Sequence, residues 1–205
     1  MLQRLGITPD SQVVVYDAAD GAMAAARFWW LVKLLGHDRV AVLDGGYARW
    51  LALGLPVTAE ITTPVAGCYD APFDATRFVG TDEVAAAMAN GGVCLLDARA
   101  GERFRGDVEP LDRAAGHIPG ARNRPYSANM AEGRFRDADA LKAGFDTLTG
   151  NRDASQVVLS CGSGVTACHN LLAMEYAGLH GARIYAGSWS AWVSDPSRPI
   201  ATGPD

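Results

Sequence analysis

Short apolar runs alternate with longer helix-forming stretches along most of the chain. The runs contain few polar positions, a pattern typical of strands that are buried on both faces of a parallel sheet. They lie at residues 13–16, 40–43, 93–97, 156–160 and 183–185. The stretches between them favour helices, several followed by a glycine, at residues 22–35, 49–53, 81–89, 138–148 and 165–177. This order predicts an α/β fold with a parallel sheet.

Residues 61–77 interrupt this order. They contain Thr62, Thr63, Pro64 and Gly67, and they show neither helical nor strand periodicity. We interpret this stretch as a linker between two domains, because a segment without an apolar face cannot contribute to a packed core.

The sequence before the linker repeats part of the sequence after it. Residues 13–17 align with residues 157–161 at an offset of 144. At offsets of 142 and 143 the correspondence continues through Gly36 and Gly178, Gly45 and Gly187, Tyr47 and Trp189, Trp50 and Trp192, and residues 55–57 and 198–200. Two homologous domains are the natural interpretation of this repeat.

The first copy is expected to be partial. In the second copy the strand at 93–97 begins 68 residues before Cys161, and the same distance before Asp17 lies ahead of the first residue. A sheet cut in this way would expose a strand edge and an apolar face that includes Trp29, Trp30 and Leu34. We expect this surface to be covered, either by the second domain or by a second chain, and we favour a homodimer.

Composition and charge narrow the range of partners. Of the 205 residues, 49% are hydrophobic and 20% are charged, which excludes a disordered or low-complexity chain. The net charge of −5 leaves no excess of basic groups for nucleic acid or anionic lipid, so neither is expected as a partner. The longest apolar stretch, residues 21–35, contains Arg27 and Lys33 and is too short to cross a bilayer. No export signal is evident, and we expect a cytoplasmic protein.

Cysteines and histidines give no sign of a metal centre. None of the four cysteines forms a C-x-x-C pair, and the four histidines have no metal-ligand spacing. The sequence therefore predicts no metal and no cofactor. A free cysteine remains available for chemistry.

Cys161 has the position of a nucleophile. It ends an apolar strand and precedes a helix, and the carboxyl ends of strands in open α/β sheets are where ligands bind. The first copy has Asp17 at the corresponding place, so only the second copy is expected to be catalytic. The alternative is an inert cysteine buried at a strand end.

The residues after Cys161 are expected to form an anion-binding loop. Glycines allow successive backbone N–H groups to point inward, and the start of a helix adds to the field, so that a thiolate or a persulfide anion is stabilised. The loop consists of Gly162, Ser163, Gly164, Val165 and Thr166.

This loop resembles the active-site loop of the two-domain sulfurtransferases, the rhodanese family, and is most similar to its mercaptopyruvate sulfurtransferase branch. Further motifs support the resemblance. They are residues 96–99 (Leu-Asp-Ala-Arg), 103–106 (Arg-Phe-Arg-Gly), 116–121 (Gly-His-Ile-Pro-Gly-Ala) and 187–192 (Gly-Ser-Trp-Ser-Ala-Trp). The first 57 residues resemble the latter half of the family's catalytically silent N-terminal domain.

The resemblance implies an enzyme with a rhodanese-like open parallel sheet flanked by helices. On this interpretation residues 1–60 are a partial silent domain, residues 61–77 a linker and residues 78–205 the catalytic domain. The implied reaction is a double displacement: Cys161 takes a sulfane sulfur from a donor and passes it to a thiol, sulfite or cyanide acceptor, with a redox protein as one form of thiol acceptor.

The resemblance also bears on the donor. Thiosulfate enzymes of the family carry basic side chains after the cysteine, whereas this chain has Gly162 and Ser163, as in the mercaptopyruvate branch. Arginines hold the substrate carboxylate in that branch, and a guanidinium suits the task because it binds a carboxylate with two hydrogen bonds. Arg103 matches the first of them, and Arg113 is our candidate for the second.

Two other functions remain open. One is a rhodanese-like binding or sulfur-carrier module without turnover. The other is a phosphatase of the Cys-x5-Arg type, which is disfavoured because Ala167 stands where the phosphate-binding arginine is required. For the residues around the loop we favour structural roles: an Asp97–Arg99 ion pair, a turn oriented by His117, and a Cys168 that packs inside.

Overall fold

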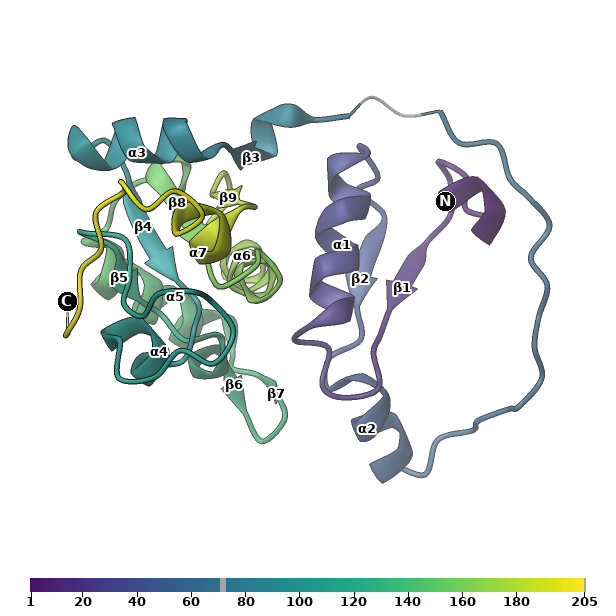
Figure 1. The fold of residues 1–205 in the computed structure, drawn as a ribbon. Coiled ribbons are helices and arrows are strands. Elements are labelled where there is room, and N and C mark those ends of the chain that lie inside the picture. The colour runs from purple at the N-terminus through teal and green to yellow at the C-terminus, as the bar shows by residue number, and fades with distance from the viewer. Residues whose placement is uncertain (71–72, 205) are drawn as a thin grey trace. The chain divides into compact units, whose positions relative to one another are not determined.

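The computed structural model describes residues 1–70 and 73–204 and divides the chain into two compact units. Unit 1 is Met1–Ala75 and unit 2 is Thr76–Asp205. Within the described residues no helix is both long and apolar enough to cross a membrane. Figure 1 shows the ribbon of each unit.

Unit 1 is built on two strands, β1 (Val13–Val15) and β2 (Val40–Val42), which pair in parallel with Val13 opposite Val40. Helix α1 (Ala24–Leu34) follows β1, and helix α2 (Gly46–Ala52) follows β2. A 3-10 turn, η1 (Leu2–Leu5), precedes β1. The sequence pattern predicted this second helix from residue 49, so α2 begins three residues earlier than expected. Helix α1 connects the two strands as expected of a parallel crossover.

The apolar face of α1 that was expected to be covered is buried in the structure. This helix contacts both β1 and β2, and Trp29, Trp30 and Leu34 are each 3% exposed. Among the exposed apolar side chains of unit 1 are two at β1 and directly after it: Val14 is 55% and Tyr16 is 59% exposed.

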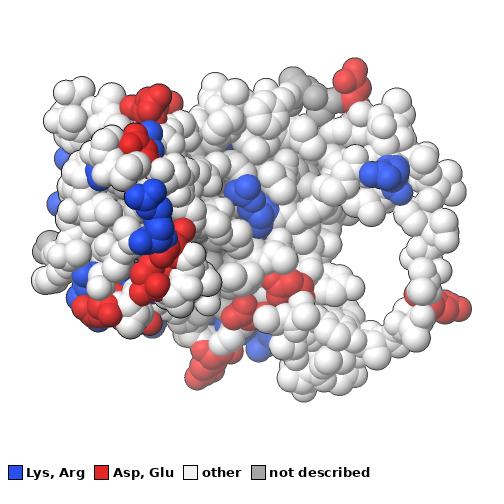
Figure 2. All heavy atoms as spheres, viewed as in Figure 1, with Lys and Arg blue, Asp and Glu red and all other residues white. Residues whose placement is uncertain are grey.

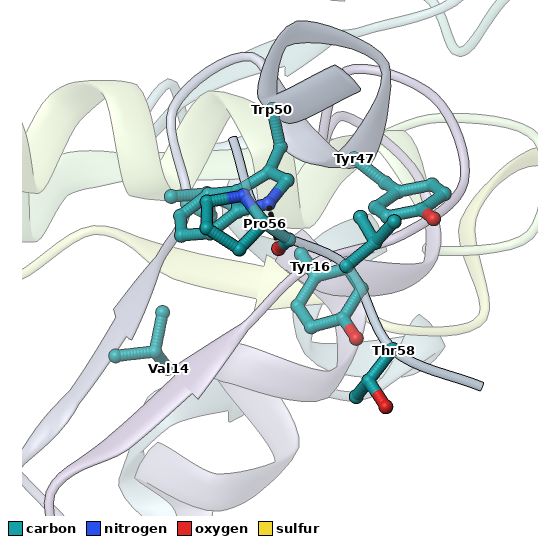
Figure 3. Close-up of a pocket in the computed structure, with 8 residues that line it drawn as sticks. Val14, Tyr16, Tyr47, Trp50, Pro56 and Thr58 are labelled. Carbon is teal, nitrogen blue, oxygen red and sulfur yellow. Dashed lines mark hydrogen bonds between the residues drawn. The ribbon is translucent and has the colours of Figure 1, made fainter. Parts of the chain in front are cut away.

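These two residues border a pocket of about 480 Å³ that is lined by side chains of unit 1 alone (Figure 3). Its walls are mainly aromatic and aliphatic: Val14, Tyr16, Leu43, Tyr47, Trp50, Pro56, Val57 and Thr58. The Trp50 Nε1–H donates to the Pro56 carbonyl at 2.9 Å, which fixes the segment after α2 along one wall. Unit 1 thus presents an apolar hollow beside a strand that has a partner on one side, β2, in the described part of the chain.

Part of the predicted linker is held to unit 1. Gly67 N–H donates to the Gln3 carbonyl at 2.8 Å, and the Tyr69 hydroxyl donates to the Leu35 carbonyl at 3.2 Å. No helix or strand is assigned to the described residues between α2 and Ala75, in agreement with the lack of periodicity. The predicted linker also includes Pro72, which lies outside the described residues.

Unit 2 contains a five-stranded sheet in which all neighbours are parallel, in the order β3-β9-β8-β4-β5. The strands are β3 (Phe78–Val79), β4 (Cys94–Asp97), β5 (Arg122–Asn123), β8 (Val157–Ser160) and β9 (Arg183–Tyr185). The central strands β4 and β8 are buried at every position. This burial explains why their sequences are continuous apolar runs.

Helices cover the sheet of unit 2. They are α3 (Thr81–Ala89), α4 (Gly101–Arg105), α5 (Ala138–Thr149), α6 (Thr166–Tyr176) and α7 (Ser188–Trp192). Helix α5 contacts α6, and α3 contacts α7. Other elements of the unit are a β6–β7 hairpin (Met130–Ala131 and Arg134–Phe135) and the 3-10 turns η3 (Tyr126–Asn129) and η4 (Ala154–Gln156). A further 3-10 turn, η2 (Ala75–Arg77), begins at the last residue of unit 1. On the face in Figure 2, acidic and basic side chains of unit 2 lie next to one another.

A hydrophobic core on one side of this sheet holds the ends of its central strands in place. Leu95 of β4 and Val158 of β8 pack there with Phe104 of α4 and Trp189 of α7. Because β4 and β8 are paired in register, Asp97 opposite Ser160, the loops that follow them leave the sheet side by side. That is the edge where the candidate nucleophile lies.

Candidate active site

Cys161 lies directly after β8 in the turn that leads to α6, and it is 2% exposed. The sulfur accepts a hydrogen bond from the Gly164 N–H at 3.1 Å. The backbone of Cys161 is fixed on both sides: its N–H donates to the Ser188 hydroxyl at 3.0 Å, and its carbonyl accepts from the Trp189 N–H at 3.0 Å. The start of α7 therefore holds the cysteine, while the loop supplies an N–H donor to the sulfur.

The turn requires glycine at position 164. Gly164 has a φ of +77°, and a Cβ atom at this position would lie 2.5 Å from the Ala186 carbonyl oxygen. A side chain would meet both a strained backbone and a steric clash. Only glycine therefore lets the loop turn back so that its N–H reaches the sulfur.

The other predicted loop residues surround the cysteine in different ways. The Gly162 carbonyl accepts hydrogen bonds from the Ser190 N–H at 2.9 Å and the Ser190 hydroxyl at 2.8 Å, which tie the loop to α7. Ser163 is exposed, Val165 occupies the N-cap position of α6, and Thr166 is its first residue. The structure thus brings the five loop residues into one turn around Cys161.

Arg103 reaches this turn from α4. A Cβ atom placed on Gly162 would lie 3.6 Å from both terminal nitrogens of Arg103. The guanidinium is 17% exposed and is held by two carboxylates, with Glu109 at 2.6 Å and Asp112 at 3.3 Å. A planar cation able to bind a carboxylate therefore lies beside Gly162, the residue that follows the candidate nucleophile.

Arg113, the other predicted arginine, contacts the backbone after α7. Its side chain is exposed, and its guanidinium donates to the Ser194 carbonyl at 3.4 Å. Among the contacts of the described residues, none joins Arg113 to the cysteine loop. The neighbouring Asp112 takes the place beside Arg103.

Glu109 and Asp112 are site residues that the sequence analysis missed. Glu109 bridges Arg103 and Arg99, and Asp112 lies over Gly162. Burial raises the pKa of Glu109, but hydrogen bonds from Arg103 and from the backbone N–H groups of Leu111 and Asp112 outweigh it, so its pKa lies below the ordinary value. The available signal is three acids within ten residues after a candidate substrate arginine, of which Asp107 pairs with Arg105 instead.

The structural roles expected around the loop are confirmed. Arg99 pairs with Asp97 through its Nη2 at 2.7 Å, and both side chains are almost fully buried. His117 Nδ1 lies 2.8 Å from the Phe104 carbonyl and its ring stacks on Phe104, so it orients the turn that it begins. Cys168 is fully buried, and its thiol donates to the Gly164 carbonyl at 3.2 Å.

A buried thiol with an N–H donor on its sulfur and an arginine beside it suits nucleophilic catalysis on an anionic substrate. The residues that the structure describes include no group of three or more His, Cys, Asp or Glu side chains arranged to hold a metal ion.

Comparison with known proteins agrees with this arrangement. The sequence signature of the Rhodanese-like domain matches residues 1–53 and 80–195. A Pseudomonas aeruginosa protein named as a probable 3-mercaptopyruvate sulfurtransferase is 47% identical over 98% of this chain and 72% of its own length. A thiosulfate sulfurtransferase of Mus musculus is 36% identical over 97% of this chain and 69% of its own.

A solved structure shows the same fold. The crystal structure of SseA from Escherichia coli, described as a 3-mercaptopyruvate sulfotransferase with the rhodanese fold, superposes with a TM-score of 0.78. The two sequences are 32% identical, and the match covers 92% of this chain and 71% of SseA. Fold, sequence signature and relatives lead to one conclusion: this chain belongs to the family of proteins built from rhodanese-like domains.

Proposed function

We propose that the chain is a sulfurtransferase that moves a sulfane sulfur from 3-mercaptopyruvate, or from thiosulfate, through a Cys161 persulfide to a thiol, sulfite or cyanide acceptor. The observation that carries the proposal is the buried Cys161 sulfur with the Gly164 N–H donating to it. The names of the relatives, which include both kinds of sulfurtransferase, support the same reaction.

In the first half-reaction the Cys161 thiolate attacks the sulfur of 3-mercaptopyruvate. A new S–S bond forms as the donor's C–S bond breaks, and the bonding electrons leave with the carbon as the enolate of pyruvate, which takes up a proton. The persulfide keeps the negative charge on its outer sulfur. The Gly164 N–H, which donates to the Cys161 sulfur, stabilises the thiolate that attacks, and the start of α6 adds to the favourable field at the loop.

In the second half-reaction the acceptor attacks the outer sulfur of the persulfide. The S–S bond breaks, the sulfur leaves with the acceptor, and Cys161 returns as a thiolate. The Cys161 thiolate is the nucleophile of the first step and the leaving group of the second, so the Gly164 N–H that donates to its sulfur serves both.

Two arginines have proposed roles with the donor. Arg103 binds the carboxylate of 3-mercaptopyruvate, since its guanidinium borders Gly162. Arg113 stays a prediction for a second contact with the donor. Neutral Gly162 and Ser163 favour 3-mercaptopyruvate over thiosulfate, because the loop itself offers no cation for a dianion.

Mass spectrometry of the intact chain tests the reaction. Incubation with 3-mercaptopyruvate should add one sulfur atom, and an acceptor thiol should remove it with release of the expected product. Cys161→Ser should take up none, whereas Cys68→Ser, which removes an exposed thiol, should behave as the unaltered chain. Equal addition to Cys161→Ser would contradict the assignment. A persulfide that no acceptor discharges would instead indicate a carrier module.

We also propose that two copies associate through unit 1. Strand β1 has the exposed residues Val14 and Tyr16 and borders the apolar pocket of Figure 3. A second copy can pair its own β1 in antiparallel orientation across a two-fold axis, which joins two two-stranded sheets and covers both apolar surfaces.

Light scattering at micromolar concentration tests this dimer. The unaltered chain should have twice the mass of one chain. Val14→Lys should be a monomer because it places a charge on the strand edge. Ile61→Lys, at a side chain that is 94% exposed and outside the strands, should stay dimeric. A monomeric unaltered chain would refute the proposal.

A further inference from the structure

A carboxylate lies at the active-site loop beside the arginine proposed to bind the donor. The Oδ2 atom of Asp112 is 3.3 Å from Arg103 Nη2 and would be 3.9 Å from a Cβ atom on Gly162, the residue next to Cys161. The Asp112 side chain is 11% exposed, so it lies at the rim of the site rather than on the open surface. An anion that approaches Arg103 therefore also approaches Asp112.

The charges around the loop do not balance. Asp97, Glu109 and Asp112 supply three carboxylates against the two guanidinium groups of Arg99 and Arg103, which leaves one surplus negative charge. The charge of Asp97 is neutralised by Arg99, which donates hydrogen bonds to it from both Nε and Nη2.

Glu109 accepts more hydrogen bonds than Asp112 does. It accepts from both arginines and from the backbone N–H groups of Leu111 at 3.1 Å and Asp112 at 3.2 Å. Asp112 contacts Arg103 at the longer distance, and its oxygen faces the loop. The surplus negative charge therefore acts where the donor binds.

The geometry points to Asp112 as a specificity-determining residue that selects a singly charged donor over a doubly charged one. This inference rests on the proposed sulfurtransferase activity and names a further reason for its donor preference. The carboxylate competes with an incoming anion for Arg103 and repels that anion directly. At neutral pH 3-mercaptopyruvate carries one carboxylate charge and thiosulfate carries two, so the direct repulsion is twice as large for thiosulfate.

The test is Asp112→Asn, which keeps the shape of the side chain and removes its charge. We expect kcat/KM for thiosulfate to rise about tenfold and that for 3-mercaptopyruvate about threefold, because the effect of one charge on the logarithm of kcat/KM doubles for a dianion. The gain should appear in KM. Release of Arg103 from its second carboxylate acts in the same direction, because the attraction of the freed cation also scales with the charge of the donor.

Two control variants separate charge from folding. Asp112→Glu keeps the charge and should keep the donor ratio of the unaltered chain. Asp107→Asn removes an exposed carboxylate that pairs with Arg105 in the same segment, and it should change neither donor. Equal effects of Asp112→Asn on the two donors, or a fall in kcat/KM for both, would overturn the inference.

Binding gives the same test without turnover. Calorimetry on Cys161→Ser, with and without Asp112→Asn, measures the affinities for thiosulfate and for 3-mercaptopyruvate directly. A larger gain for thiosulfate supports the role of Asp112 even where no sulfur is transferred, whereas an unchanged ratio refutes it. Absence of sulfur transfer by the unaltered chain would contradict the proposed activity but not the role of Asp112 in anion binding.

Discussion

The turn after β1 and the turn after β8 share a backbone frame but hold different side chains. In unit 1 the Tyr47 N–H donates to the Asp17 carbonyl at 3.1 Å, and in unit 2 the Trp189 N–H donates to the Cys161 carbonyl at 3.0 Å. The repeat in the sequence is therefore also a repeat in hydrogen bonding. It extends to the tryptophan that follows, since Trp50 and Trp192 each donate to a proline carbonyl at 2.9 Å.

The two turns differ in what their N–H groups bind. Asp17 fills its own turn: Oδ1 accepts from the N–H groups of Ala19 at 3.1 Å and Gly21 at 2.9 Å, and Oδ2 accepts from that of Ala25 at 3.3 Å. In unit 2 the Gly164 N–H points to the sulfur of Cys161. The corresponding turns hold a carboxyl group in unit 1 and a thiol in unit 2, which supports the proposal that the second copy is the catalytic one.

The surroundings of the two turns differ as well. Tyr47 and Trp50 line the apolar pocket of unit 1, whereas their counterparts Trp189 and Trp192 belong to the core of unit 2 together with Phe104. The segment that covers this core also carries Arg103, Glu109 and Asp112 to the loop. A working site therefore needs the turn and the covering segment together.

The largest effect is expected where the catalytic turn requires glycine. Gly164→Ala should lower the free energy of unfolding by about 3–4 kcal/mol, through a positive φ and overpacking against the Ala186 carbonyl. Gly178→Ala is the matched control, because Gly178 has a φ of +78° but no heavy atom within 4 Å of its Cβ position, so it should cost only about 1 kcal/mol. Urea denaturation measures both, and equal costs would remove the steric argument.

Arg103→Ala should have the next largest effect. The loss of a charged hydrogen-bonding partner should raise KM for 3-mercaptopyruvate about thirtyfold, close to 2 kcal/mol, with a smaller change in kcat. Arg105→Ala, in the same helix but paired with the exposed Asp107, should leave KM unchanged. Steady-state kinetics of Arg113→Ala, measured in parallel, gives the effect of the second predicted arginine on KM. Identical KM values for the Arg103 and Arg105 variants would contradict the proposed binding role.

Elements with local signals were predictable from the sequence. The buried strands β4 and β8 are continuous apolar runs, α6 has helix-forming residues followed by Gly178, and Cys161 stands at the junction between strand and helix. Each of these signals lies in adjacent residues. That is why the order of elements and the position of the nucleophile could be read without any tertiary information.

Features fixed by contacts distant in sequence escaped prediction. Strands β3 and β5 have two residues each, and α4 and α7 have five, too few for a periodic pattern. Ser188 adopts a φ of +51° and bonds to Cys161, although nothing in its neighbours signals this. The place of Asp112 over Gly162 depends on how the segment after α4 folds back, and the sequence alone favoured Arg113.

A smaller effect is expected in the silent turn. Asp17→Ala should cost about 1–2 kcal/mol, since three backbone N–H groups lose the carboxylate that accepts from them. Hydrogen exchange should become faster at Ala19, Gly21 and Ala25. Asp17→Asn, which keeps one acceptor oxygen, should lie between that variant and the unaltered chain. Unchanged exchange at these amides would show that the carboxylate does not fill the turn in solution.

The smallest effect concerns Glu109, whose pKa is lowered from the ordinary value of 4.5 because hydrogen bonds from Arg103 and two backbone N–H groups outweigh the effect of burial. A carboxyl with a lowered pKa in the folded state stabilises the fold above its unfolded pKa, and this stabilisation is lost as the pH falls through the folded value. The unaltered chain should therefore exceed Glu109→Gln in unfolding free energy at pH 7, and the difference should shrink below about pH 4.5. Urea denaturation across this range measures it, and a difference that grew on acidification would show that the ion pairs at Glu109 do not stabilise the catalytic unit.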